Sequence, residues 1–347
     1  GARLSQAVNL LAALLAALAL APAPAAAQRP APVLDTVAVV ASRTGARDAA
    51  RSVDVVTRAE IARMPARSVA DVLQMRLGVD VDGRSPAQAD LSVRGSSPEQ
   101  VLVLVDGVRV SDAQSAHYAL DLAVPLSSVE RIEILRGAGS ASYGPDAVGG
   151  VINIVTTSRA VAPALELHGG GFGTVGGAAS IGHDAGGLAV ASSASYEKSD
   201  GHRPGTDYRR GDARLALSSQ AGPGVLRTTL GVGVRDFGAA AFYAPYNSIE
   251  RTGASTLDAR WDAELGRWAL STGAGTRLHT DRYTLIRDDP SVYENRHRSW
   301  QTSGELVART TAGPVALALG GDGAEDQLSS TGLGGRREWR AGLFGEG

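Results

Sequence analysis

The chain has 347 residues, a formal net charge of -2 and no cysteine. The near-neutral charge disfavours a nucleic-acid partner, and without cysteine the sequence offers no disulfide framework, thiolate metal site or cysteine nucleophile. Its six histidines show no common metal-ligand spacing, and it contains no nucleophile elbow or phosphate-binding loop, so we expect no enzyme activity.

The first 27 residues have the organisation of a secretory leader. Arg3 precedes an apolar run over 8–20, and two prolines and three alanines follow it. This run is shorter than the ~20 residues that a membrane-spanning helix needs, which favours a cleaved signal peptide over an anchor. We expect cleavage before Gln28, and because the chain starts with Gly1 we expect its natural start to lie upstream.

Residues 28–49 are expected to form a flexible N-terminal segment. It contains a short β-prone run that can pair with the edge of a partner's sheet. The run consists of Asp35, Thr36, Val37, Ala38, Val39, Val40 and Ala41.

Residues 50–157 predict a compact mixed α+β domain. A strand over 52–56 is followed by a capping box, Thr57 to Glu60, that opens a short helix ending at Pro65. A second helix is expected from Ser68 to near Gly78.

The second half of this domain predicts buried strands. Asp106-Gly107 joins the apolar runs 101–105 and 108–110, which is a strong hairpin pattern. Residues 130–137 alternate with charges on one face, and 151–155 are typical of a buried strand.

Four segments of the domain resemble the plug motifs of TonB-dependent receptors in both order and spacing, namely residues 91–95, 103–109, 129–137 and 143–154. The run 35–41 is similar to the family's TonB box, particularly in the vitamin B12 transporter subgroup, with Ala38 in place of a larger apolar residue. The resemblance implies that 50–157 is a plug domain in the outer membrane and that 35–41 contacts the inner-membrane protein TonB.

Residues 160–347 show strands of alternating polarity separated by turn residues, as in a barrel with one face in lipid and a polar lumen. The alternation is clearest in 226–234, 257–265 and 268–280. A soluble β-sandwich produces the same alternation, but the leader and the plug motifs favour the barrel. The predicted fold is an α+β plug domain followed by an antiparallel transmembrane β-barrel, of which this part supplies about ten of an expected 22 strands. Since an open sheet leaves unpaired edges in lipid, we expect the sequence to be truncated at Gly347.

The resemblance further implies that a scarce metal chelate, cobalamin or a ferric siderophore, binds at the outer side. Two plug apices, at 84–88 and 111–118, and two outer loops, at 197–212 and 236–251, are the expected sources of contacts. The candidate ligand-binding residues are Arg84, Ser85, Gln88, Gln114, His117, Tyr118, Phe242, Tyr243 and Tyr246. Ordinary loop packing and an interfacial aromatic belt are the alternative roles for these residues.

The vitamin B12 subgroup binds calcium through loop aspartates, which implies a candidate structural calcium site and no other cofactor. Its ligands would be Asp200, Asp207, Asp212 and Asp236. Arg209 and Arg210 lie among them and disfavour a dense carboxylate cage.

Two other functions remain open. A passive outer-membrane channel shares the barrel pattern but has no use for a plug or a coupling segment. A surface receptor that binds a ligand without transport would be favoured by a long signalling domain ahead of 35–41, whereas only about seven residues separate Gln28 from Asp35.

Overall fold

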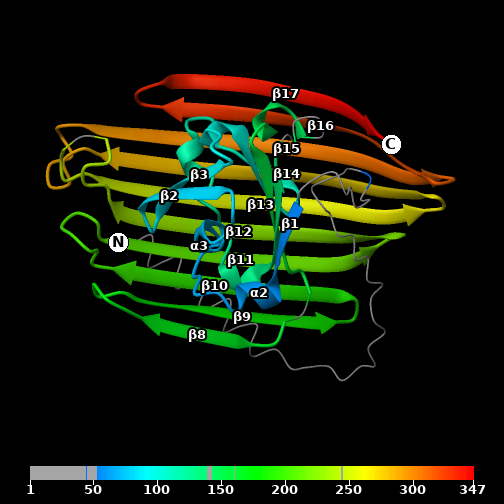
Figure 1. The fold of residues 1–347 in the computed structure, drawn as a ribbon, viewed down its shortest axis with the longest axis horizontal. Helices are drawn as coiled ribbons and strands as arrows, with labels where there is room; N and C mark the ends of the chain where they lie inside the picture. Colours follow the sequence, from blue (N-terminus) through cyan, green and yellow to red (C-terminus); the bar gives the residue numbers. More distant parts are fainter. Residues whose placement is uncertain (1–43, 45–52, 138, 140–142, 160, 244) are drawn as a thin grey trace.

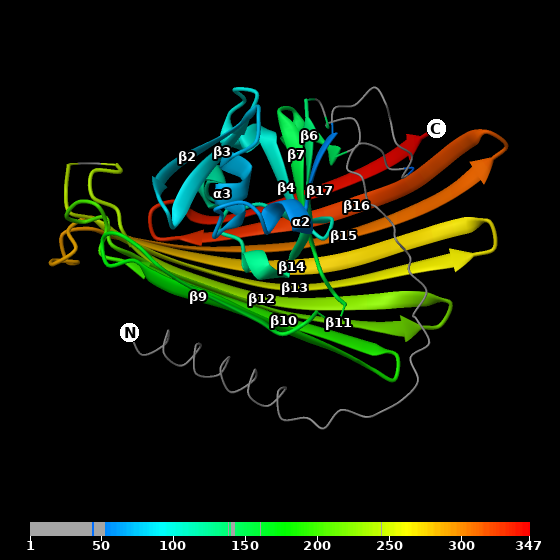
Figure 2. The ribbon, with the colours of Figure 1, turned by 60° about the horizontal axis from the view of Figure 1, so that its bottom comes forward.

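A computed structural model describes Thr44, 53–137, 139, 143–159, 161–243 and 245–347. The expected leader (1–27) and coupling run (35–41) lie outside the described residues. None of the helices in the described part has the length and apolar character needed to span a bilayer. Two bodies make up the described chain, a small mixed domain over 53–157 and a large curved sheet over 164–346 (Figures 1 and 2). The small domain lies on the concave face of the sheet, so we call it the plug domain and the sheet the wall.

The plug domain is built on a five-stranded sheet with the order β1-β6-β7-β4-β5, beside a two-stranded hairpin of β2 and β3. Only β4 and β7 run parallel. The bounds are β1 Val53–Thr57, α2 Arg58–Ile61, α3 Val69–Gln74, β2 Val79–Ser85, β3 Gln88–Val93, β4 Val101–Val105, β5 Val108–Val110, β6 Val129–Arg136 and β7 Gly150–Thr156, with short 3₁₀ turns at Pro98–Gln100, Ala116–Tyr118, Leu126–Ser128 and Pro145–Ala147.

Both predicted helices begin at the expected caps. Thr57 and Glu60 form a reciprocal capping box at the start of α2, and Ser68 and Asp71 form one at the start of α3. The helices end at Ile61 and Gln74, a few residues before the expected Pro65 and Gly78.

The core of the plug domain lies around β4, β6 and β7. All five residues of β4 are buried, as the continuous apolar run predicted. The alternation over 130–137 predicted a charged face on β6, but Glu133 is fully buried there. It accepts hydrogen bonds from Arg131 Nε at 2.7 Å and Asn153 Nδ2 at 3.1 Å. Because β6 is an interior strand flanked by β1 and β7, a charge on it needs such partners.

The wall is one ten-stranded antiparallel sheet in sequence order, with β8 and β17 at its edges. Its strands are β8 Ala164–Gly169, β9 Val175–Ala185, β10 Leu188–Ser199, β11 Tyr208–Ala221, β12 Gly224–Gly238, β13 Ile249–Leu265, β14 Trp268–Thr284, β15 Glu294–Ala312, β16 Val315–Ser330 and β17 Gly334–Glu346. The three segments with the clearest alternation, 226–234, 257–265 and 268–280, lie in β12, β13 and β14. About ten strands were predicted here, and this prediction is confirmed.

Alternation along the wall strands separates two faces. In β12, Leu230 is 47% exposed on the convex face whereas its neighbour Thr229 is 6% exposed on the face toward the plug domain. In β14, Arg277 and His279 are buried on that same inner face. The convex face is therefore apolar and the inner face polar, as expected for a wall between lipid and a filled lumen.

The two ends of the wall differ in the length of their connections. Two-residue turns join the strands at one end, at 186–187, 222–223, 266–267 and 313–314. Longer loops lie at the other end, to the left in Figure 1, over 170–174, 200–207, 239–248, 285–293 and 331–333. The outer loops predicted at 197–212 and 236–251 are shorter in the structure, because strand pairing continues to Ser199↔Tyr208 and Gly238↔Ile249.

Candidate functional site

At the long-loop end, the tip of the plug hairpin β2–β3 meets the loop between β12 and β13. The Arg84 guanidinium lies 5.4 Å from the ring centroid of Tyr243 and donates a hydrogen bond to the Phe242 carbonyl at 3.4 Å. Arg210 of β11 donates to the Pro86 carbonyl at 3.0 Å. The plug apex and the outer loop thus form one surface, which we call the mouth.

Aromatic side chains form most of the mouth. The Tyr243 ring packs edge-on against Tyr283 at 5.3 Å and against Phe242 at 6.3 Å. Tyr243 and Tyr246 are both about half exposed, while Phe237, whose ring lies 6.2 Å from that of Phe242, is buried. Rigid aromatic rings with one exposed face beside a guanidinium suit a flat organic ligand that carries acceptor groups.

The structure brings some of the predicted ligand-binding residues together and gives the others internal contacts. Arg84, Phe242 and Tyr243 are in direct contact, and Tyr246 lies in the same loop. By contrast, buried Ser85 accepts a hydrogen bond from the Ala87 amide at 3.0 Å within the hairpin turn.

The remaining predicted residues lie deeper in the plug domain. Buried Gln88 donates to the His117 carbonyl at 3.4 Å, and His117 Nδ1 lies 2.6 Å from Asp90. The backbone N–H of Gln114 donates to Asp112 Oδ1 at 2.9 Å. Tyr118 is buried and its hydroxyl donates to Glu250 of β13 at 2.8 Å. The contacts of Gln88, His117 and Tyr118 connect the apex 111–118 to β3 and β13.

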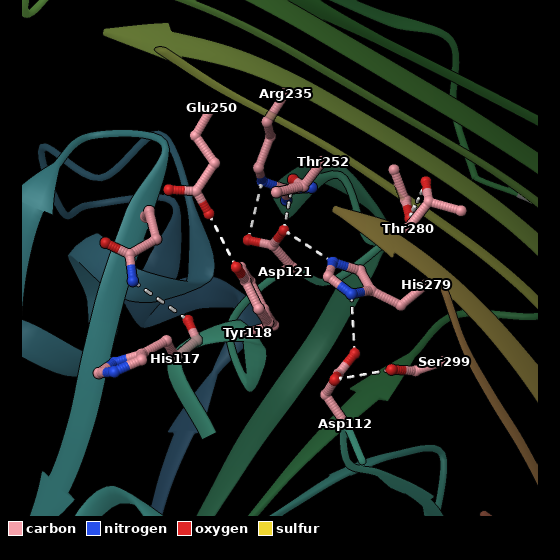
Figure 3. A network of polar contacts seen from close by, with 12 residues as sticks. Asp112, His117, Tyr118, Asp121, Arg235, Glu250, Thr252, His279, Thr280 and Ser299 are labelled. Carbon is pink, nitrogen blue, oxygen red and sulfur yellow. Dashed lines mark hydrogen bonds and ion pairs between the residues drawn. The ribbon is translucent and has the colours of Figure 1, made fainter. Parts of the chain in front are cut away.

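Below the mouth, a buried ionic network joins the plug domain to β12, β13 and β14 (Figure 3). His279 of β14 has Nδ1 at 2.7 Å from Asp112 and Nε2 at 3.2 Å from Asp121, both of the plug domain. Arg235 of β12 approaches Asp121 at 3.6 Å, and Thr252 of β13 donates to it at 2.5 Å. The network therefore pairs plug anions with wall cations.

The network changes the ionisation of the plug carboxyls. Burial by itself raises the pKa of Asp112, but the hydrogen bond and charge of His279 and the charge of Arg277 outweigh it and lower that pKa well below its ordinary value. The pKa of Asp121 is lowered in the same way, since the Arg235 charge and His279 outweigh its burial. Burial and the nearby Glu250 charge raise the pKa of the Tyr118 hydroxyl. Both aspartates are therefore held as carboxylates.

Two further contacts attach the plug domain to the wall. Asp106, in the β4–β5 turn, accepts hydrogen bonds from Thr156 and from Arg214 of β11, the latter at 2.5 Å. Asp146 forms ion pairs with Arg109 at 2.9 Å and with Arg340 of β17 at 2.7 Å. Both repeat the pairing of a plug carboxylate with a wall arginine.

The four candidate calcium ligands do not come together. Asp207 is held by Arg287, whose hydrogen bonds lower the Asp207 pKa, and Asp212 is paired with Arg235 at 3.3 Å. Asp236 lies 3.4 Å from Arg251. The described part of the chain contains no group of three or more His, Cys, Asp or Glu residues that could hold a metal ion.

The sequence analysis missed the aspartates that join the two bodies, Asp106, Asp112 and Asp121. The sequence marks these aspartates only by their position, since each follows or lies within a polar loop next to an apolar strand. The wall residues that pair with them could be predicted to face inward, since Arg277 and His279 occupy polar positions of an alternating strand. Which aspartate pairs with which wall residue, more than 100 positions away in the chain, is seen only in the structure.

Comparison with known proteins assigns the domain. Residues 45–151 match the family model of the TonB-dependent receptor plug domain. The vitamin B12 transporter BtuB of Vibrio cholerae serotype O1 is 42% identical over 130 residues, which cover 36% of this chain and 21% of that protein. This chain thus matches about a fifth of the length of that relative.

Solved structures extend the likeness to the wall. The pyoverdine outer membrane receptor FpvA of Pseudomonas aeruginosa, bound to pyoverdine, superposes with a TM-score of 0.65 at 14% identity and covers 84% of this chain and 48% of that receptor. The siderophore receptor PirA of Pseudomonas aeruginosa gives a TM-score of 0.62 at 21% identity, covering 84% of this chain and 52% of that one. At these identities the likeness concerns the fold.

The plug match, the polar inner face and the shared fold of plug and wall agree with one another and with the motifs in the sequence. Residues 45–151 match the plug-domain family of TonB-dependent receptors, and the plug domain with β8–β17 has the fold of the compared outer membrane receptors.

Proposed function

We propose that this protein imports a scarce metal chelate, cobalamin or a ferric siderophore, across the outer membrane with energy delivered by TonB. The chelate binds at the mouth, and TonB pairs with residues 35–41. The observation that carries the proposal is the mouth itself, where the plug apex at Arg84 and the outer loop at Tyr243 are in contact. A ligand bound there touches both the wall and the element that must move.

Energy coupling follows from the location of the protein. The outer membrane has neither ATP nor a sustained ion gradient of its own, so uphill import needs work transmitted through a protein contact. A β-prone run ahead of β1 can supply that contact by strand addition to a partner's sheet. The first described strand, β1, begins at Val53 and is an edge strand of the plug sheet, so a pull on the preceding segment acts directly on that sheet.

Cobalamin is the favoured ligand of the two. The relative named as a vitamin B12 transporter shares 42% identity, whereas the superposed pyoverdine and siderophore receptors share 21% or less. The wide exposed aromatic faces at the mouth are compatible with either ligand, so the preference rests on the sequence match.

The test uses the complete gene expressed in a host that lacks its own cobalamin and siderophore receptors. Uptake of radiolabelled cyanocobalamin and of a ferric siderophore is measured with the wild-type protein and with a deletion of 35–41. We expect the deletion to abolish uptake and to leave surface binding intact. Undiminished uptake by the deletion variant would support a passive channel, and binding without uptake by the wild type would support a surface receptor.

A further inference from the structure

A row of charged side chains crosses the wall next to its long loops, within two residues of the loop end of each strand. Strand pairing sets its members directly opposite one another from β10 to β15. Five of the six members are basic, so we call it the basic row. In strand order they are Lys198, Arg209, Asp236, Arg251, Arg282 and Arg296.

The basic row lies on the convex face of the wall. Side chains alternate between the two faces along a strand, and Arg251 and Arg282 directly follow Glu250 and Asp281, which are buried on the inner face. The side chains of Arg251, Arg282 and Arg296 are 53%, 41% and 64% exposed. The plug domain lies against the opposite, concave face (Figure 2). The row therefore has no role in holding the plug domain.

Like charges face one another directly within the basic row. Lys198 is opposite Arg209, and Arg282 has an arginine on each side, Arg251 and Arg296. Like charges directly opposite on neighbouring strands destabilise a sheet. The sheet gains nothing from this arrangement by itself, whereas an anion bound from outside would remove the repulsion.

The carboxylates on the same face neutralise only part of this charge. Asp236 lies 3.4 Å from Arg251, and Glu294 accepts hydrogen bonds from Arg282 at 2.6 Å and from Arg296 at 2.7 Å. Three exposed cations form no ion pair with any residue in the part of the chain that the structure describes, namely Lys198, Arg209 and Arg298, the last being two residues beyond Arg296 on the same face of β15.

An apolar band begins directly beside the basic row. Tyr196 is two residues from Lys198 on the same face of β10, and Val232 is four residues from Asp236 on the same face of β12. Tyr196, Val232 and Trp300 of β15 are all exposed. In outer-membrane barrels an aromatic girdle flanks the lipid-facing band, and the longer loops are extracellular. The basic row is therefore at the level of the lipid headgroups on the outer side.

We propose that the basic row, together with Arg298, binds a phosphate-bearing lipid of the outer leaflet. The phosphate groups contact the guanidinium groups, and the acyl chains cover the adjoining apolar band. A guanidinium binds two phosphate oxygens at once, and several guanidinium groups in one row suit a headgroup with more than one phosphate. The proposal rests on the wall lying in the outer membrane and involves neither a chelate nor TonB.

The test measures lipid binding to the complete protein in detergent by native mass spectrometry. Lipid A with two phosphates is titrated into the wild type, Arg209→Gln, the double variant Lys198→Gln/Arg209→Gln and the control Arg267→Gln. Neither Lys198 nor Arg209 has an ion pair to break, and Arg267 is exposed in the short turn at the other end of the wall. We expect affinity to fall about fivefold for each charge removed from the row and to stay unchanged in Arg267→Gln.

Equal affinity of the double variant and the wild type would overturn the proposal. An equal loss in Arg209→Gln and Arg267→Gln would overturn it as well, because the effect would then come from net charge alone. Far-UV circular dichroism checks that each variant is folded.

A second arm replaces the probe by lipid A with one phosphate and by phosphatidylcholine, which has no net charge. We expect the first to bind more weakly than the probe and the second to bind most weakly. Equal binding of all three lipids would show that the acyl chains alone occupy the surface, against the proposal. Chelate uptake is measured separately, so either proposal can fail while the other stands.

Discussion

His279 joins the wall to the plug domain through two carboxylates. Its two ring nitrogens face two plug carboxylates, Asp112 and Asp121, and all three side chains are buried. Both hydrogen bonds can be donated only by the doubly protonated ring. A buried charge is tolerated when its partners are complete, and removing one partner leaves the others uncompensated.

Asp112→Asn should destabilise the docked plug domain by about 3–5 kcal/mol, because Arg277 and His279 lose a buried counter-charge. Native-state hydrogen exchange of plug amides measures this change. Asp82→Asn is the matched control, since Asp82 is exposed on β2 and should change stability by less than about 0.5 kcal/mol. Equal protection in the two variants would show that the network does not hold the plug domain.

Asp112 also makes the stability of the folded protein depend on pH in the acid range. The pKa of Asp112 is lower in the folded protein than its ordinary value of 3.8, so its contribution to stability is complete above that value and is lost as the pH falls below it. Between about pH 4 and pH 2 the wild type should lose more stability than Asp112→Asn, which lacks this contribution. Parallel acid curves for the two proteins, followed by circular dichroism, would contradict the assignment.

At the scale of elements, the β4–β5 turn has two roles. Asp106 and Gly107 have φ of 52° and 81°, the conformation expected of this dipeptide in a tight hairpin. The same turn brings Asp106 against Arg214 of the wall. This short local motif therefore fixes the hairpin and also, through Asp106, a contact between the plug domain and the wall.

Gly107→Ala is therefore expected to be costly. Gly107 has a positive φ that L side chains rarely adopt, and a Cβ there would also lie 2.8 Å from Arg260 Nη1. We therefore expect the free energy of unfolding to fall by about 1–3 kcal/mol. Gly83→Ala on β2 is the control, because the nearest atom to its Cβ would be 3.8 Å away and its φ is not positive. Urea denaturation gives both values, and a neutral Gly107→Ala would mean that the turn can relax.

On the lipid-facing side of the wall strands, the cost of a charged substitution should depend on its depth in the bilayer. Leu230 lies near the middle of β12, and Leu226 lies near its short-turn end on the same face. Leu230→Arg should cost about 2–4 kcal/mol in folding into lipid vesicles, and Leu226→Arg about 0–1 kcal/mol. If the two cost the same, the convex face is not in a bilayer.

At the scale of the whole molecule, the mouth exists only where two bodies meet. Arg84 comes from the plug domain and Tyr243 from an outer loop, 159 positions later in the printed sequence. Neither body alone presents the guanidinium beside the aromatic faces, so ligand binding reports on the docked state.

Tyr243→Ala is expected to weaken binding of the proposed chelate by about 5- to 30-fold, the equivalent of the ~1–2 kcal/mol of an aromatic or cation–π contact. Arg84→Ala should have an effect of the same size, because it removes the other half of the pair. Tyr196→Ala serves as the control, since Tyr196 is exposed on the outward face of β10. Equal binding by all three variants in an equilibrium assay on whole cells would place the ligand elsewhere.

Local sequence patterns are sufficient to predict the elements, namely the helix caps at Thr57 and Ser68, the hairpin at Asp106-Gly107, the plug motifs and the alternating wall strands. These depend on neighbours within a few residues, through backbone hydrogen bonding, turn conformation and the two-residue period of a strand. Only the folded protein shows that Glu133 is buried, that Asp112 and Asp121 enclose His279, and that Arg84 reaches Tyr243. Those contacts join residues far apart in the chain, and a charge in a loop has the same local pattern whether it faces water or a buried partner.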